Sequence, residues 1–256
     1  MATGRTVASR WDRCYVDGYD FSGQARKIGP LSLEYDAADL TALADPVKGY
    51  YPNHPNVNVG AINSVFDNTA TTGIHNRLAT AGAIRTVTVA RGIRAAPAQG
   101  DPVFAGQFTQ GEYSVAEDGG AMTVNLPFVG WAEDATSLLF ASPWGVLLNN
   151  STRTAVNAAA GVDNDTGGAT THSAFIVYQV TAGNGTATIT AQEASINSDV
   201  NFAAITGLTT GSIDCAVVQY GLVAGLPTAT IKQYTRWQIS LGTATTVTFV
   251  LSLHRG

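Results

Sequence analysis

The last third of the chain alternates apolar and polar residues and carries almost no charge. Between 173 and 256 it holds three acids and three bases, so its net charge is zero. Because successive side chains of a strand point to opposite faces, each alternating run predicts a strand with one buried and one solvated face. The clearest inward-facing sets are Ala187, Ile189 and Ala191, and Val247, Phe249, Leu251 and Leu253. The solvated positions are mostly Thr, Ser and Asn, which indicates a structural or binding module.

Length, charge and cysteine content exclude several classes of protein. The 256 residues allow one large domain or two small ones. The net charge of −5 lies entirely in residues 1–172, and the absence of a Lys/Arg cluster excludes a sequence-specific DNA-binding protein. Cys14 and Cys215 each lie in an apolar run, which predicts two buried free thiols. With no signal-peptide pattern and no membrane-spanning run, we expect a soluble product made in the cytoplasm.

Turn residues and periodicity predict a mainly β fold with one short helix. The expected N-terminal strands are 13–21 (with an Asp-Gly turn), 31–35, 85–90, 103–113, 122–128 and 138–148. The expected C-terminal strands are 174–181, 185–193, 200–206, 213–219, 228–241 and 245–254. The helix is expected over 67–81, capped by Asp67 or Asn68 and closed by Gly82. The segment 40–59, with its prolines and adjacent tyrosines, is expected to be a long loop.

These elements predict two domains. Residues 1–150 are expected to form a β-sandwich or barrel that contains the helix. Residues 151–171, rich in Asn, Thr, Ala and Gly, are expected to be a linker, and 172–256 a β-sandwich of jelly-roll or immunoglobulin-like type. On strand 228–241 the inward face should hold Ile231, Trp237, Ile239 and Leu241, so Arg236 is expected to be exposed.

No compact catalytic or metal-binding motif occurs in the sequence. The four histidines share no metal-ligand spacing, and no nucleophile elbow or phosphate-binding loop is present. Asp163, Asn164 and Asp165 resemble the start of a calcium loop, but the closing Glu is missing. Tyr234, Arg236 and Gln238 share one strand face, where they form either a ligand-binding stripe or a domain or subunit contact. We therefore expect no enzyme activity, no cofactor and no metal.

Three stretches precede the predicted helix in a characteristic order: residues 15–23 (YVDGYDFSG), 41–52 (TALADPVKGYYP) and 63–68 (NSVFDN). Together they resemble the tail tube (major tail) proteins of long-tailed bacteriophages, although Pro52 is followed by Asn53 where those proteins have Gly. The segments 185–189, 234–237 and 246–255 resemble the C-terminal sandwich domain that some of these proteins carry.

This resemblance implies a structural virion protein of the phage tail. Residues 1–150 would be the tail-tube-like assembly domain and 172–256 an outward-facing decoration. The partners would be copies of the chain in stacked hexameric rings, other tail proteins, and DNA that passes through without specific contacts. The expected subunit-interface residues, in or beside the apolar cluster of the 40–59 segment, are Leu43, Tyr50, Tyr51 and Pro52. The alternatives are a capsid decoration or other virion surface protein and a carbohydrate-binding module.

The absence of metal chemistry is testable directly. Purified protein should contain no stoichiometric metal by mass spectrometry, and its Tm should be unchanged by a chelator. A bound ion that disappears in the Asp163→Ala, Asp165→Ala double variant would contradict this expectation and would support the calcium-loop interpretation.

Overall fold

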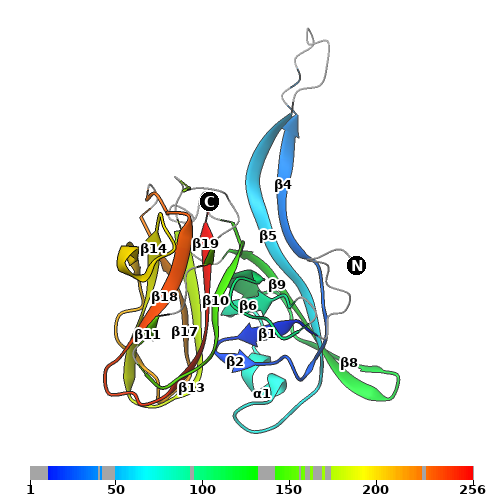
Figure 1. Ribbon diagram of the computed structural model, residues 1–256. Coiled ribbons are helices and arrows are strands. Elements are labelled where there is room, and N and C mark those ends of the chain that lie inside the picture. The colour runs from blue at the N-terminus through cyan, green and yellow to red at the C-terminus, as the bar shows by residue number, and fades with distance from the viewer. Residues whose placement is uncertain are drawn as a thin grey trace. The chain divides into compact units, whose positions relative to one another are not determined.

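The computed structural model describes residues 11–39, 41, 50–92, 95–131, 142–155, 157–158, 162–163, 169–170, 174–226 and 229–255. These residues form a mainly antiparallel β fold with one short α-helix, which confirms the predicted fold class (Figure 1). No helix within these ranges is long and apolar enough to cross a membrane.

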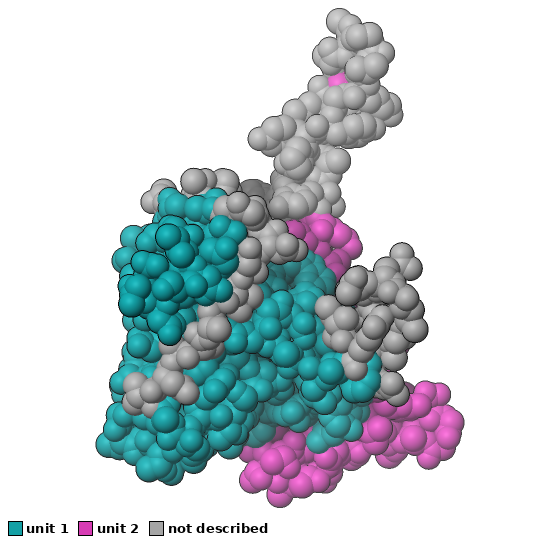
Figure 2. Space-filling view, viewed as in Figure 1, with its two compact units in different colours: residues 1–25, 85–107, 133–256 teal, residues 26–84, 108–132 magenta. Residues whose placement is uncertain are grey.

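The chain divides into two compact units, which Figure 2 shows in different colours. Unit 1 comprises residues 1–25, 85–107 and 133–256, and unit 2 comprises residues 26–84 and 108–132. Unit 1 is therefore built from three separate segments of the chain, and unit 2 from the two segments between them. The linker expected at 151–171 falls in that last segment, and its first residues continue a strand that ends at Arg153. The position of the domain boundary stays a prediction.

The large sheet of unit 1 brings together strands that are distant in sequence. Its strands hydrogen-bond in the order β17, β13, β19, β10, β7, β6, β1, β2. Their bounds are β1 (Arg13–Val16), β2 (Tyr19–Asp20), β6 (Ile84–Ala90), β7 (Pro102–Gln110), β10 (Trp144–Arg153), β13 (Ala174–Gly183), β17 (Gln219–Ala224) and β19 (Val247–Arg255). Strand β19 pairs antiparallel with β13 on one side and with β10 on the other.

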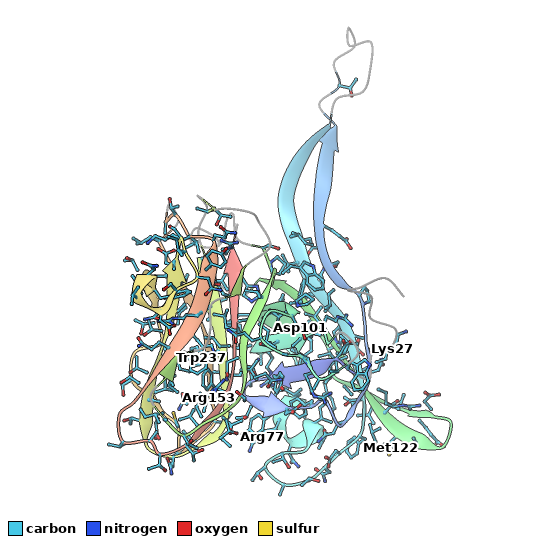
Figure 3. All side chains as sticks on the ribbon, viewed as in Figure 1. Lys27, Arg77, Asp101, Met122, Arg153 and Trp237 are labelled. Carbon is cyan, nitrogen blue, oxygen red and sulfur yellow. The ribbon has the colours of Figure 1, made fainter. Side chains whose placement is uncertain are left out.

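A second sheet of unit 1 packs on one face of the large sheet through an apolar core. Its strands are β11 (Asn157–Ala158), β12 (Val162–Asp163), β14 (Thr186–Ala194), β15 (Ala203–Thr209), β16 (Ile213–Asp214) and β18 (Tyr234–Leu241). The inward residues predicted from alternation in β14 and β19 are all fully or almost fully buried in this core. Trp237 meets Phe249 edge-on at 5.6 Å, and the Arg153 guanidinium lies 4.5 Å from the Trp237 ring centroid (Figure 3).

The opposite face of the large sheet buries a polar network centred on Gln179 of β13. The Gln179 side chain is completely buried and accepts a hydrogen bond from the Gly18 N–H at 2.8 Å. Its amide nitrogen donates to the Thr88 hydroxyl at 2.7 Å. Gly18 has φ +79°, and a Cβ there would lie 2.2 Å from Val218, so only glycine fits this turn. A single side chain thus links the β1–β2 turn, strand β6 and strand β13.

The same face of the large sheet buries a histidine. His254 is fully buried and stacks on Phe175 with ring centroids 4.5 Å apart. Its Nε2 atom lies 2.8 Å from the Ser252 hydroxyl. Burial lowers the pKa of His254 to about 3, so the ring is neutral at physiological pH.

The thiols of Cys14 and Cys215 are both free and buried, as predicted, and burial raises the pKa of Cys14 to about 12.

Unit 2 is built on a smaller set of strands and the helix. They are β3 (Ala25–Ile28), β4 (Leu31–Asp39), β5 (Tyr50–Val65), β8 (Ser114–Asp118), β9 (Ala121–Trp131) and α1 (Ile74–Leu78). Strand β5 pairs with β3, β4 and β9, and β9 also pairs with β8 and with the last residues of β7, Phe108–Gln110, which belong to unit 2. As alternation predicts, Val124, Leu126 and Phe128 of β9 are buried, whereas Met122 on the same face is 53% exposed at the β8–β9 turn (labelled in Figure 3).

The helix predicted over 67–81 is much shorter in the structure, at Ile74–Leu78. Asp67 does not cap it, because its carboxylate instead accepts hydrogen bonds from the N–H and hydroxyl of Thr69 in a turn. Thr71 has φ +71°, which is incompatible with a continuous right-handed helix. The helix therefore begins only after Gly73, where a Cβ would lie 2.5 Å from the Thr69 backbone nitrogen.

The long loop expected over 40–59 is also wrong for residues 50–59, which belong to the 16-residue strand β5; residues 40 and 42–49 lie outside the described residues. Over 34–39 and 50–56, β4 and β5 pair only with each other among the described strands. A ribbon of two strands has no neighbouring layer that would impose alternation between apolar and polar residues. The hydrophobic pattern therefore gave no strand signal there, and the prolines favoured a loop.

The Gln179 network predicts a large stability effect. Gln179→Ala should lower the free energy of unfolding by about 2–4 kcal/mol, because it leaves the buried Gly18 N–H and Thr88 hydroxyl without this partner. Gln179→Leu restores the volume without the hydrogen bonds and should recover only a small part of the loss.

Denaturant unfolding measures both effects. The matched control is Gln219→Ala on β17, which is partly exposed and should cost under about 1 kcal/mol. A Gln179→Leu variant as stable as the wild type would show that the polar network does not hold these strands together.

Candidate functional site

The most distinctive surface feature of unit 2 is a two-stranded extension of its sheet. Strand β4 pairs with β5 from Leu31–Val59 to Asp39–Tyr50, whereas β9 pairs with β5 only over Asn58–Val65. We call the part beyond β9, residues 34–39 and 50–56, the β4–β5 ribbon (Figure 1). An isolated pair of strands is only marginally stable in water, so such a ribbon is typical of a segment completed by a partner.

Three of the four predicted interface residues belong to this ribbon. Tyr50, Tyr51 and Pro52 begin β5, where their backbones lie opposite Asp39, Ala38 and Ala37. Leu43 lies outside the described residues. The structure thus gives these three positions an extended, paired backbone, and their role in a subunit interface stays a prediction.

The charge of the chain is concentrated in the unit that carries the ribbon. Residues 26–84 and 108–132 contain four bases and eight acids, so unit 2 accounts for −4 of the net charge of −5. One described ion pair of unit 2, Arg26–Asp118 at 3.6 Å, joins side chains that are 48% and 73% exposed and contributes little stability. Unit 2 therefore carries most of the negative charge of the chain, and its acidic residues Glu34, Glu112, Glu117 and Asp118 are exposed.

Unit 2 also exposes apolar side chains on its sheet. Val115 of β8 lies opposite the buried Val124 of β9 and is 39% exposed. Met122, two residues before Val124 on the same face, is 53% exposed. The apolar face of the sheet thus continues past the covered core into the β8–β9 hairpin. Exposed apolar area of this kind is a common feature of protein contact surfaces.

Unit 1 carries the sequence-predicted stripe on the outer face of its second sheet. The expectation that Arg236 is exposed was wrong, since it is only 7% exposed. Its guanidinium lies 4.1 Å from the Phe202 ring centroid, its Nε donates to Gln192 at 2.7 Å, and its Nη1 pairs with Asp199 at 2.6 Å. Alternation did place Arg236 opposite the core residue Trp237, but it could not reveal that residues 199–202 cover this face.

The described residues contain no group of three or more His, Cys, Asp and Glu side chains able to hold a metal ion. Asp163 ends β12, while Asn164 and Asp165 lie outside the described ranges, so the calcium-loop alternative is untested. His75 Nδ1 lies 2.7 Å from the Tyr113 hydroxyl, and its ring is tilted against Phe66 with centroids 5.0 Å apart, an arrangement that fits packing around α1.

Comparison with known proteins includes a weak structural similarity. No protein-family model and no curated protein matches the chain. Among solved structures, the chain is similar to the Dit protein (gp 19.1) of SPP1, described as a paradigm of the hub adsorption apparatus in phages that infect Gram-positive bacteria. The TM-score is 0.34 and the identity 11%, over 94% of this chain and 98% of that one. These values are too low to establish a common fold or role.

The Arg236 cluster generates a corrected stability prediction. Arg236→Ala should lower the free energy of unfolding by about 1–3 kcal/mol, rather than the negligible amount expected for a surface residue, because it removes buried charge-assisted hydrogen bonds. Trp237→Ala, on the other face of the same strand, should cost roughly 3–5 kcal/mol by emptying the core.

Urea unfolding of both variants provides the measurement. Ser240→Ala, an exposed position on the same face as Arg236, is the control and should be nearly neutral. An Arg236→Ala variant as stable as this control would show that Asp199 and Phe202 do not hold the guanidinium in solution.

Proposed function

We propose that this chain is a structural protein of the tail of a long-tailed bacteriophage, and that copies of it form hexameric rings that stack into the tail tube. The observation that carries the proposal is the β4–β5 ribbon, whose strand β5 begins with residues 50–52, the end of the segment 41–52 by which the sequence resembles tail tube proteins. A heterologous contact, in which one surface of a subunit binds a different surface of the next, closes into a ring when the rotation is right. A ribbon with free strand edges is suited to such a contact.

The distribution of charge supports the same role. DNA that moves through a tube must not adhere to its wall, and the acidic surface of unit 2 would repel phosphate groups. In this proposal unit 2 forms the tube, with Tyr50, Tyr51 and Pro52 in the contact between subunits. Unit 1 supplies the second sheet, whose outer strands carry mainly hydroxyl and amide side chains, as the outward-facing decoration. Other tail proteins are the remaining partners, and the site of action is the virion tail.

The proposal assigns no catalysis, cofactor or metal to the chain. The proposed structural role depends on the shape of the subunit, on strand pairing and on electrostatic repulsion of DNA, and none of these requires an activated nucleophile.

Electron microscopy of the purified protein tests the proposal. At high concentration the wild-type chain should form rings and stacked tubes. A variant in which residues 35–55 are replaced by Asn-Gly, so that a two-residue turn joins the paired residues Glu34 and Asn56, should fold but remain monomeric. Analytical ultracentrifugation gives the oligomeric state and circular dichroism confirms the β fold.

The matched control places the same Asn-Gly turn in the other hairpin of unit 2, in place of Gly119-Gly120, where both φ angles are already positive. This variant should assemble like the wild type. Normal assembly of the ribbon-deleted chain would exclude the ribbon as the assembly element. Single rings that never stack would favour a hub component over a tube, and a wild-type chain that stays monomeric at all concentrations would refute ring formation.

A further inference from the structure

The outer face of the second sheet of unit 1 is a regular polar surface that tube assembly does not explain. Strands β14 and β18 pair so that their outward residues lie in four cross-strand pairs. These pairs are Thr188–Ser240, Thr190–Gln238, Gln192–Arg236 and Ala194–Tyr234. The surface, which we call the outer polar face, therefore carries hydroxyls, amides, one guanidinium and one phenol, with no large aliphatic side chain.

A chain of hydrogen bonds fixes the polar side chains at the centre of this face. Arg236 Nε donates to Gln192 Oε1 at 2.7 Å, and the Gln192 amide donates in turn to Gln238 Oε1 at 2.9 Å. At the other end, Arg236 holds one carboxylate oxygen of Asp199 at 2.6 Å. The chain thus runs from Gln238 through Gln192 and Arg236 to Asp199.

The two ends of this chain face water although its centre does not. Gln192 and Arg236 are 8% and 7% exposed, whereas the Asp199 side chain is 89% exposed and Gln238 is also exposed. The amide group of Gln238, whose oxygen is engaged by Gln192, and the exposed carboxylate of Asp199 are therefore a donor and an acceptor held in place. Fixing such groups before binding reduces the entropy lost when a ligand is bound.

The outer polar face has no excess of positive charge. Arg236 is the single charged residue among the eight paired positions, and it pairs with Asp199. Asp163 of β12 lies in register with Tyr234. A surface without excess positive charge does not favour phosphate, sulfate or nucleic acid. The exposed aliphatic side chains nearby, Ile196 and Val200, lie in the segment between β14 and β15 and not among the eight paired positions.

Aromatic rings lie beside the polar centre. The Phe202 ring packs against the Arg236 guanidinium, and Tyr234 is the next outward residue of β18. A ring beside fixed amide and carboxylate groups matches the chemistry of a sugar, which has an apolar C–H face and several hydroxyls that both donate and accept.

We infer that the outer polar face binds a neutral carbohydrate, with Gln238 and Asp199 contacting sugar hydroxyls and Tyr234 packing on a sugar ring. Arg236 and Gln192 act as positioning residues. Thr190, which lies 3.3 Å from Thr209 of β15 through their hydroxyls, extends the surface along the sheet. The inferred binding is separate from ring formation, which the proposed function assigns to unit 2.

A glycan array bearing bacterial surface polysaccharides and their component sugars, probed with the full-length protein, tests this inference. The neutral glycan that binds most strongly is then titrated into the protein by isothermal titration calorimetry. Gln238→Ala removes one exposed hydrogen-bonding group and should weaken binding about tenfold. Tyr234→Ala should weaken it by a similar factor.

The control is Gln99→Ala, which removes the same type of side chain from an exposed loop of unit 1 and should bind like the wild type. The near-UV circular dichroism spectrum, which reports the packing of the aromatic side chains, verifies that each variant is folded. Absence of binding to every neutral glycan on the array would overturn the inference. Binding that both Gln238→Ala and Tyr234→Ala leave unchanged would place the ligand elsewhere and overturn it equally. Ring assembly should be normal in both variants, so failure of this inference is distinguishable from failure of the proposed function.

Discussion

The buried side chain of Gln179 is the constraint on which unit 1 depends. It joins a turn near residue 18, a strand near residue 88 and a strand near residue 179 through hydrogen bonds that no apolar side chain could make. An unpartnered donor in this environment costs more than one hydrogen bond contributes, so the three segments are held in a single arrangement. The tight contact at Gly18 adds a steric condition to the same point. The apolar core on the other face of the large sheet can then form against strands whose positions are already fixed.

The two units divide the chemistry of the chain between them. Unit 2 combines acidic charge, an unsupported ribbon and exposed apolar residues such as Met122, which are properties suited to contacts with other copies. Unit 1 combines a fully packed sandwich core with a neutral outer face of hydroxyls and amides. Self-association and ligand contact would therefore draw on different surfaces, so that each could change in evolution without disturbing the other.

Local pattern in the sequence was sufficient for several strands that have one buried and one solvated face, but not for 213–219, which the structure divides into β16, a turn and the start of β17. Alternation located β9, β14 and β19 and identified inward residues such as Leu126, Ile189 and Phe249. It failed for β5, where residues 50–56 pair only with β4 among the described strands, and for the helix, because Asp67 and Thr71 adopt turn conformations that composition does not reveal. It also failed for Arg236, which is covered by a segment almost forty residues away along the chain. Of these failures, that of Arg236 reflects a contact between distant segments, which periodicity within a strand does not encode.

The place of β19 in the large sheet has a consequence for the order of folding. Residues 247–255 lie between β13 and β10, so unit 1 lacks the middle of its sheet until they have been synthesised. All residues of unit 2 precede residue 133, so they are synthesised before strands β10, β13, β17 and β19. During that interval the apolar residues of β1 and β6, such as Val16 and Val89, which are buried in the folded protein, are present before the sheet is complete. A nascent chain would thus contain all residues of unit 2 before the strands of the sandwich are complete, which makes chaperone binding to the early strands valuable until synthesis is complete.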